Sequence, residues 1–336
     1  DWFELDLKNG VINPDGSQEV VLTLDATDIS EDIIFEADVR FIHNANDGIF
    51  NLPITLEVLG GERILELDLV EGWNLISINV VPDNPNVRDI TRPLVNEGVL
   101  ILLKNGIGQF YLPEQDFCNI NEWEVSDGYL IKVTDVALLE VRGEAIPVDQ
   151  PIALRQGWNM SAYFPRQAVN AVTSLAGIAD NLIIAKDGFG RFYLPEFGFS
   201  NMGNLQVGLG YQYNVREAIE LVYQVGEEVA LAGLDVIHPK HFGTVTPTGE
   251  NMSIYLSGIP QMSEFEIGIF TPGGMLVGSG RIDRNGNFGI AVWGDDVITD
   301  VIDGAVELDA LSFILWDGKK ESNLSPTPIS GKPVWA

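Results

Sequence analysis

One ten-residue pattern occurs twice in this chain of 336 residues. Residues 104–113 have the sequence KNGIGQFYLP, and residues 186–195 have the sequence KDGFGRFYLP. Gly-Trp-Asn precedes each copy, at 72–74 and 157–159. Gly-Tyr follows each copy, at 128–129 and 210–211. Three signatures in the same order, present twice, indicate a duplicated module.

Each repeat is expected to consist mainly of strands, because short apolar runs alternate with glycine- and proline-containing turns. A short helix is expected over 87–95 in the first repeat, where Pro93 should end it early. The corresponding helix is expected over 168–175, which has better helix formers and no proline. Asn105-Gly106 and Asp187-Gly188 fit hairpin turns whose residues have positive φ.

Small β domains are expected on both sides of the repeats. Residues 19–25 alternate between polar and apolar, as a half-buried strand does, and turn residues at 13–17 precede them. Toward the C-terminus, strands separated by Gly- and Asp-rich turns predict a β-sandwich. The expected fold class is all-β with minor α. The predicted domains are a β-sandwich at 1–60, β-rich repeats at 61–147 and 148–233, and a β-sandwich at 234–336.

The composition argues against several partners. Forty-nine acidic residues against 19 basic ones give a formal charge of −30, which repels nucleic acid and anionic lipid. No run of about 18 apolar residues is present, so membrane insertion is not expected. Cys118 is the single cysteine and excludes an intramolecular disulfide. It is best interpreted as a small hydrophobic residue. The start at Asp1, without Met or a signal-type stretch, suggests an excised part of a longer precursor.

Several segments resemble modules of secreted bacterial proteins. Trp2-Phe3-Glu4-Leu5, the run from 14 to 20 and Leu52-Pro53-Ile54-Thr55 resemble the immunoglobulin-like BACON and Hydin-like modules. The central repeats resemble Gly-Trp-Asn modules near the C-termini of large bacterial surface proteins, and the last region resembles a module that accompanies them. The second repeat departs from the first at 160–162, and Trp123 has no clear counterpart there. The resemblance implies an extracellular location at a bacterial cell surface and a spacer or docking role.

Catalytic chemistry has little support in the sequence. No Gly-x-Ser-x-Gly elbow, Walker loop or His-Glu-x-x-His motif occurs, and only three histidines are present. His238 and His241 flank a proline, which excludes a regular helical metal face. Carboxylate pairs for glycoside hydrolysis are formed by folding rather than by spacing, so the sequence singles out no pair. We therefore expect no enzyme, and a site between the repeats is the remaining enzymatic alternative.

Calcium is the metal that the sequence best accommodates, because Ca²⁺ takes oxygen ligands. The first candidate loop, at 283–287, has oxygen-bearing side chains at alternate positions, and a plain β-turn is the alternative. The second, at 295–303, is rich in aspartate, and a solvated acidic loop is the alternative. The candidate ligands are Asp283, Asn285, Asn287, Asp295, Asp296, Asp300 and Asp303.

Four aromatic residues at matching positions of the repeats are candidates for a binding surface: Trp73, Trp158, Tyr111 and Tyr193. Because adjacent strand residues face opposite ways, one ring of each Phe-Tyr pair should point outward. Exposed rings would suit a glycan or a protein partner. The alternative interpretation is that these residues are core shared by the two repeats.

The sequence as a whole predicts a non-catalytic, extracellular structural or adhesive segment. Self-association into filaments is one version, in which a strand from residues 1–7 or 326–335 completes the sheet of the next copy. A surface protein partner would serve adhesion in the same way. A carbohydrate-binding accessory module is the main alternative.

Overall fold

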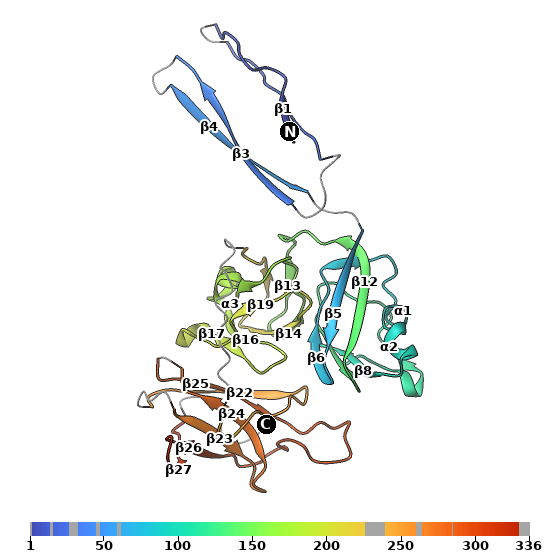
Figure 1. Cartoon of the computed structure of the whole chain (residues 1–336), viewed down its shortest axis with the longest axis vertical. Helices are drawn as coiled ribbons and strands as arrows, with labels where there is room; N and C mark the ends of the chain where they lie inside the picture. The colour runs from blue at the N-terminus through green and yellow to red at the C-terminus, as the bar shows by residue number, and fades with distance from the viewer. Residues whose placement is uncertain are drawn as a thin grey trace. The chain divides into compact units, whose positions relative to one another are not determined.

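A computed structural model defines the fold (Figure 1). It describes residues 2–13, 16–26, 33–44, 48–58, 62–225, 239–259, 264–283 and 285–328. The chain forms two compact units, Asp1–Arg63 and Ile64–Ala336. Strands dominate both units, and most of the paired strands run antiparallel. The predicted all-β class with minor α is therefore confirmed.

The first unit contains two small sheets in its described part. Strand β1 (Phe3–Leu5) pairs with β2 (Leu22–Leu24), and β3 (Ile33–Ile42) forms a long hairpin with β4 (Ile49–Val58) (Figure 1). The ring of Trp2, which precedes β1, lies 5.5 Å from the ring of Phe35 on the hairpin.

One face of the β3–β4 hairpin is apolar, because the hydrophobic residues alternate with polar ones. Val39 pairs with Leu52, and Phe41 pairs with Phe50, so their side chains share this face. Val39 and Ile54 are buried, whereas Phe50 is 56% exposed and Leu52 is 42% exposed. The face is thus covered over only part of its length.

Each repeat of the second unit contains a five-stranded sheet, and the two strand orders correspond. The first repeat has the order β10-β9-β8-β11-β6, and the second has β18-β17-β16-β20-β14. The strands of the first are β6 (Gly72–Ile76), β8 (Leu100–Asn105), β9 (Phe110–Leu112), β10 (Phe117–Cys118) and β11 (Tyr129–Val133). Those of the second are β14 (Gly157–Ser161), β16 (Leu182–Lys186), β17 (Phe192–Leu194), β18 (Phe199–Ser200) and β20 (Tyr211–Val215).

Smaller sheets complete the repeats. Strand β12 (Ala137–Ala145) lies between β5 (Glu62–Leu69) and β7 (Val80–Pro82). In the second repeat β13 (Ile152–Leu154) pairs with β21 (Ile219–Leu221), and β15 (Val169–Asn170) pairs with β19 (Asn204–Leu205).

The predicted helices are present but shorter than expected. The first is divided into α1 (Val87–Ile90) and α2 (Arg92–Asn96), and Pro93 lies in the first turn of α2, where it needs no N–H partner. The second is only α3 (Ala171–Ser174), followed by a 3-10 turn at Ala176–Ile178. It starts later than predicted because 169–170 pair in β15 and the Asn170 side chain caps the helix.

The asparagine of each Gly-Trp-Asn signature holds a turn together. The Asn74 side chain accepts a hydrogen bond from the Val70 backbone N–H and donates one to the Val70 carbonyl. Asn159 makes the same two bonds with the backbone of Arg155. The preceding glycine of each signature has φ near +90°, which disfavours other residues.

The predicted hairpin turns form, but the glycines with positive φ are not the predicted ones. Positive φ occurs at Gly108 and Gly190 rather than at Gly106 and Gly188. The side chain of Asn105 accepts hydrogen bonds from the backbone N–H groups of residues 107 and 109, and the corresponding aspartate does the same. The side-chain cap thus sets the turn.

Gly106 and Gly188 are instead points of close contact between the repeats. A Cβ atom at Gly106 would lie 2.9 Å from the Cβ of Met160, and one at Gly188 would lie 2.9 Å from the Cβ of Leu75. Met160 and Leu75 occupy corresponding positions in β14 and β6. The contact is therefore reciprocal, so each repeat places its turn on the Gly-Trp-Asn strand of the other.

The C-terminal module has two layers. Strands β22 (Asn251–Leu256) and β25 (Phe288–Trp293) form one layer. The other has the order β24 (Leu276–Arg281), β23 (Glu266–Phe270), β26 (Ser312–Trp316) and β27 (Glu321–Leu324). Ile267, Phe288 and Ile290 are among the buried residues of its core. In the described part of the chain, no helix is long and apolar enough to cross a membrane.

The reciprocal contact predicts that Gly188→Ala destabilises the second unit. The new methyl group would overlap the Cβ of Leu75, which cannot rotate away, so we expect a loss of about 1–3 kcal/mol of unfolding free energy. Gly273→Ala is the matched control, because its nearest neighbour is 3.8 Å away. Denaturant titration measures both, and equal stabilities of the two variants would contradict the prediction.

Candidate functional site

Trp73 of the first repeat is the anchor on which the C-terminal module packs. Its indole Nε1–H donates a 2.7 Å hydrogen bond to Oδ2 of Asp296, and Lys132 Nζ lies 2.6 Å from the same oxygen. Lys104 Nζ lies 4.8 Å from the centre of the indole ring, where a cation is attracted to the π face. Gly249 lies against the ring, since a Cβ there would be 3.0 Å from it. Only 7% of Trp73 is exposed.

The charges at this junction are matched. Burial alone would raise the pKa of Asp296, but hydrogen bonds from Lys132 and Trp73 outweigh that effect, so the pKa of Asp296 is lowered. The carboxylate is 5% exposed and the lysine side chain 13% exposed. Removing one partner of this buried ion pair would leave the other charge buried and unpaired, which is strongly destabilising. The junction therefore requires an acidic residue at position 296.

The second repeat meets the C-terminal module through Lys186, which corresponds to Lys104. Lys186 Nζ donates a 2.7 Å hydrogen bond to the Asn251 carbonyl and lies 5.4 Å from the centre of the Trp158 ring. Burial lowers the pKa of Lys186 to about 8, although the neighbouring Asp187 acts in the opposite direction. The lysine is thus held by a neutral carbonyl in a site that penalises its charge.

The four candidate aromatic residues do not form a common surface. Trp73, Tyr111 and Tyr193 are buried, so the alternative that these are core residues is confirmed. The expectation of one outward ring per Phe-Tyr pair is wrong for the second repeat, where Phe192 is also fully buried against Phe199. Trp158 differs from the other three, because it is 52% exposed.

The first candidate calcium loop has the hydrogen bonds of a turn. Asp283 Oδ1 accepts the backbone N–H groups of Asn285 and Asn287, both at 2.8 Å. The Asn287 side-chain oxygen accepts a hydrogen bond from the Tyr255 hydroxyl. These contacts fit the β-turn alternative.

In the second candidate loop the aspartates bind backbone and side-chain donors. Asp295 Oδ1 accepts the Asp303 backbone N–H at 2.9 Å, and Asp303 Oδ1 accepts the Asp296 backbone N–H at 3.0 Å. Asp300 is exposed. Across the described ranges, no group of three or more His, Cys, Asp or Glu residues is placed to hold a metal ion. His238 lies outside the described residues.

The loop closed by these aspartates carries exposed aliphatic side chains, a feature that the sequence analysis missed. We call residues 297–302 the aliphatic loop: Val297 is 90% exposed, Val301 66% and Ile302 64%. Thr299 Oγ1 lies 3.0 Å from the carbonyl oxygen of residue 296 and 2.8 Å from that of residue 301, and its single hydrogen can bind either one at the base of the loop. The sequence signal was present as two Val-Ile pairs within an otherwise polar stretch.

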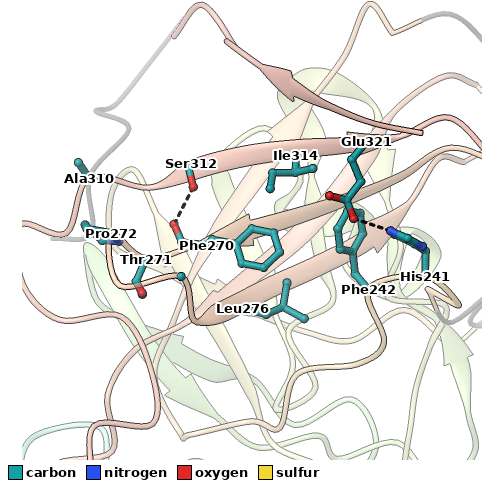
Figure 2. Close-up of a pocket in the computed structure, with 11 residues that line it drawn as sticks. His241, Phe242, Phe270, Thr271, Pro272, Leu276, Ala310, Ser312, Ile314 and Glu321 are labelled. Carbon is teal, nitrogen blue, oxygen red and sulfur yellow. Dashed lines mark hydrogen bonds and ion pairs between the residues drawn. The ribbon is translucent and has the colours of Figure 1, made fainter.

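A groove lies on the outer face of the four-stranded sheet (Figure 2). We call it the C-terminal groove; its lining includes His241, Phe242, Phe270, Thr271, Pro272, Leu276, Ala310, Ser312, Ile314 and Glu321. Figure 2 shows Phe270, Leu276 and Ile314 in its middle, His241 and Glu321 at one end, and Pro272 and Ala310 at the other.

Two local features build this groove. Gly268 on β23 leaves room for Phe242 to cross the strand, because a Cβ there would lie 2.7 Å from the Phe242 ring. The His241 ring stacks on Trp316 with 3.8 Å between centroids, and its Nε2 lies 2.7 Å from Oε1 of Glu321. The groove therefore has an apolar floor and a paired polar end.

Comparison with known proteins adds no family assignment. No protein-family model matches the chain, and neither a curated protein nor a solved structure does.

The environment of Lys186 predicts a pH-dependent stability difference between the wild type and Lys186→Met. The pKa of Lys186 is about 8 in the folded state against an ordinary value of 10.5, so between these values the unfolded chain binds more protons and stability rises with pH. Relative to Lys186→Met, the wild type should gain about 1–2 kcal/mol as pH rises from 8 toward 10.

Denaturant titrations of both proteins across this range measure the difference, and other titrating groups cancel because both proteins contain them. Lys104→Met is the matched control, because it removes the corresponding lysine of the first repeat, whose side chain is 28% exposed. A pH-independent difference between the wild type and Lys186→Met would show that the buried site does not disfavour the charged lysine.

Proposed function

We propose that this chain is a non-catalytic structural and adhesive segment of a bacterial surface protein, located outside the cell, and that it self-associates through its first unit. The observation that carries this proposal is the apolar face of the β3–β4 hairpin. Phe50 and Leu52 remain exposed on it, beside the buried Val39 and Ile54. The partner is a second copy of the same hairpin face.

The physics of small sheets supports this contact. A two-stranded hairpin is marginally stable by itself and gains stability when a second sheet covers its apolar face. Burying apolar surface contributes about 25 cal/mol per Å². The aromatic rings of Phe41 and Phe50 already lie 6.0 Å apart on the face, and two copies would bring two such pairs together.

The strand-donation version of self-association has less support. Residues 3–5 of the proposed N-terminal donor pair with β2 of their own chain, so donation would require breaking that sheet. Of the proposed C-terminal donor, 326–335, only residues 326–328 are described. Strand exchange is therefore kept as an outcome that the association experiments can reveal.

The proposal predicts that Phe50→Asp weakens self-association at least about tenfold, because a charge would be buried at the contact. Light scattering over a concentration series measures this effect, and circular dichroism verifies the fold. Phe189→Asp is the matched control, since Phe189 is 54% exposed but lies in the second repeat. Equal association of both variants would show that the hairpin face is not the contact. A monomeric wild type would contradict self-association altogether.

Carbohydrate binding is a second candidate function, favoured by the exposure of Trp158. Trp158 is 52% exposed and Lys186 lies over its ring, so the ring offers a flat apolar surface beside a cation. A single exposed ring on a β-sheet is a suitable platform for one sugar ring.

This alternative predicts saturable binding on a glycan array that Trp158→Ala abolishes without unfolding the chain. Tyr111 and Tyr193 are not suitable for this test, because both are buried and their removal would damage the core. Identical array profiles for the wild type and Trp158→Ala would dismiss Trp158 as a glycan platform.

A further inference from the structure

We propose that the C-terminal groove of one copy receives the aliphatic loop of a second copy, so that copies join head to tail. This inference rests on the proposed function, because it assumes a self-associating chain, but it places a contact in the second unit. The proposal assigns a role to the two apolar features of the C-terminal module that the fold itself does not use.

The aliphatic loop has the properties of an inserting segment. Val297, Val301 and Ile302 project into solvent, although side chains of this type are usually buried. The base of the loop is closed by the two aspartate–backbone bonds described above and is tied to the first repeat through Asp296 and Trp73. A loop held in this way loses little conformational entropy when it binds.

The C-terminal groove suits aliphatic side chains better than it suits a sugar. Its middle is formed by Phe270, Leu276 and Ile314. The hydroxyls nearby already have backbone partners, because Ser312 Oγ donates to the Phe270 carbonyl and Thr271 Oγ1 accepts the Met275 N–H. The polar side chains of the lining lie toward its two ends, whereas the apolar middle can cover valine and isoleucine side chains.

The polar end of the groove is less acidic than the chain as a whole. The aliphatic loop contains the exposed Asp300. At the polar end of the groove, Lys240 follows the chain to His241, and Lys319 and Lys320 precede Glu321, with all three lysines exposed. Glu321, Asp317 and Glu264 lie in the same part of the module and offset these lysines, so this end of the groove is near neutral and repels an acidic loop less than the rest of a chain with a formal charge of −30 does.

The positions of the loop and the groove allow the same contact to repeat from one copy to the next. The aliphatic loop is exposed and so does not occupy the groove of its own chain. Loop and groove are different surfaces of one module, which makes the contact heterologous, and a heterologous contact extends into a ring or filament instead of stopping at a dimer.

A mixing experiment on the full-length chain tests the proposal, with Phe50→Asp in every protein so that the hairpin contact is absent. The loop variant carries Val301→Asp and Ile302→Asp. The groove variant carries Ala310→Trp, which fills the groove from an exposed position, and Ile314→Asp is a second groove variant. Val136→Asp is the control, because Val136 is 69% exposed but lies in the first repeat.

Analytical ultracentrifugation should show oligomers beyond the dimer for the Phe50→Asp parent and for the Val136→Asp control. The loop variant and the groove variant should each be monomeric. An equimolar mixture should form heterodimers and nothing larger, because one intact groove and one intact loop remain.

Three results would overturn the inference: a monomeric Phe50→Asp parent, association of the single variants at the level of the parent, or a mixture that stays monomeric. A monomeric Phe50→Asp parent beside an associating wild type would overturn the inference alone and leave the hairpin contact standing. A monomeric wild type would overturn both.

Discussion

The second unit depends on the burial of Trp73. Its ring is covered by Gly249 and its indole N–H is bound by Asp296, both from the C-terminal module. The same aspartate oxygen binds Lys132, so a ring, an acid and a cation from two modules satisfy one another with little exposure to water. Without this contact the first repeat would expose an indole and the C-terminal module would leave a carboxylate in an apolar surface.

The two repeats share their local structure but differ in how their tryptophans are covered. Both keep the glycine turn, the capping asparagine and a lysine over the tryptophan ring. Trp73 pairs across its sheet with Lys132, whereas Trp158 pairs with Asn214, which has no positive charge to hold an acid. The C-terminal module therefore covers Trp73, whereas Trp158 stays 52% exposed.

The sequence predicts the local chemistry of this fold well and its long-range contacts poorly. The all-β class and the hairpin turns at Asn105 and Asp187 follow from patterns within about ten residues, whereas the capping of these turns by the side chains does not. The second predicted helix was too long because helix propensity is a local property, whereas residues 169–170 pair with a distant strand. The Trp73–Asp296 bond joins positions 223 residues apart, and Gly106 appeared to be a turn glycine when its lack of a side chain serves the neighbouring repeat.

Charge decides how such a chain can self-associate. At a formal charge of −30, two copies repel each other over a distance set by the Debye length, about 8 Å at physiological ionic strength. Association therefore has to come from short-range burial of apolar surface at places where the local charge is not acidic. The hairpin face around Phe50 offers exposed apolar side chains, and the C-terminal groove offers an apolar middle with lysines among the acids at one end. Elsewhere the acidic surface suppresses unspecific contacts, which favours a few defined contacts over aggregation.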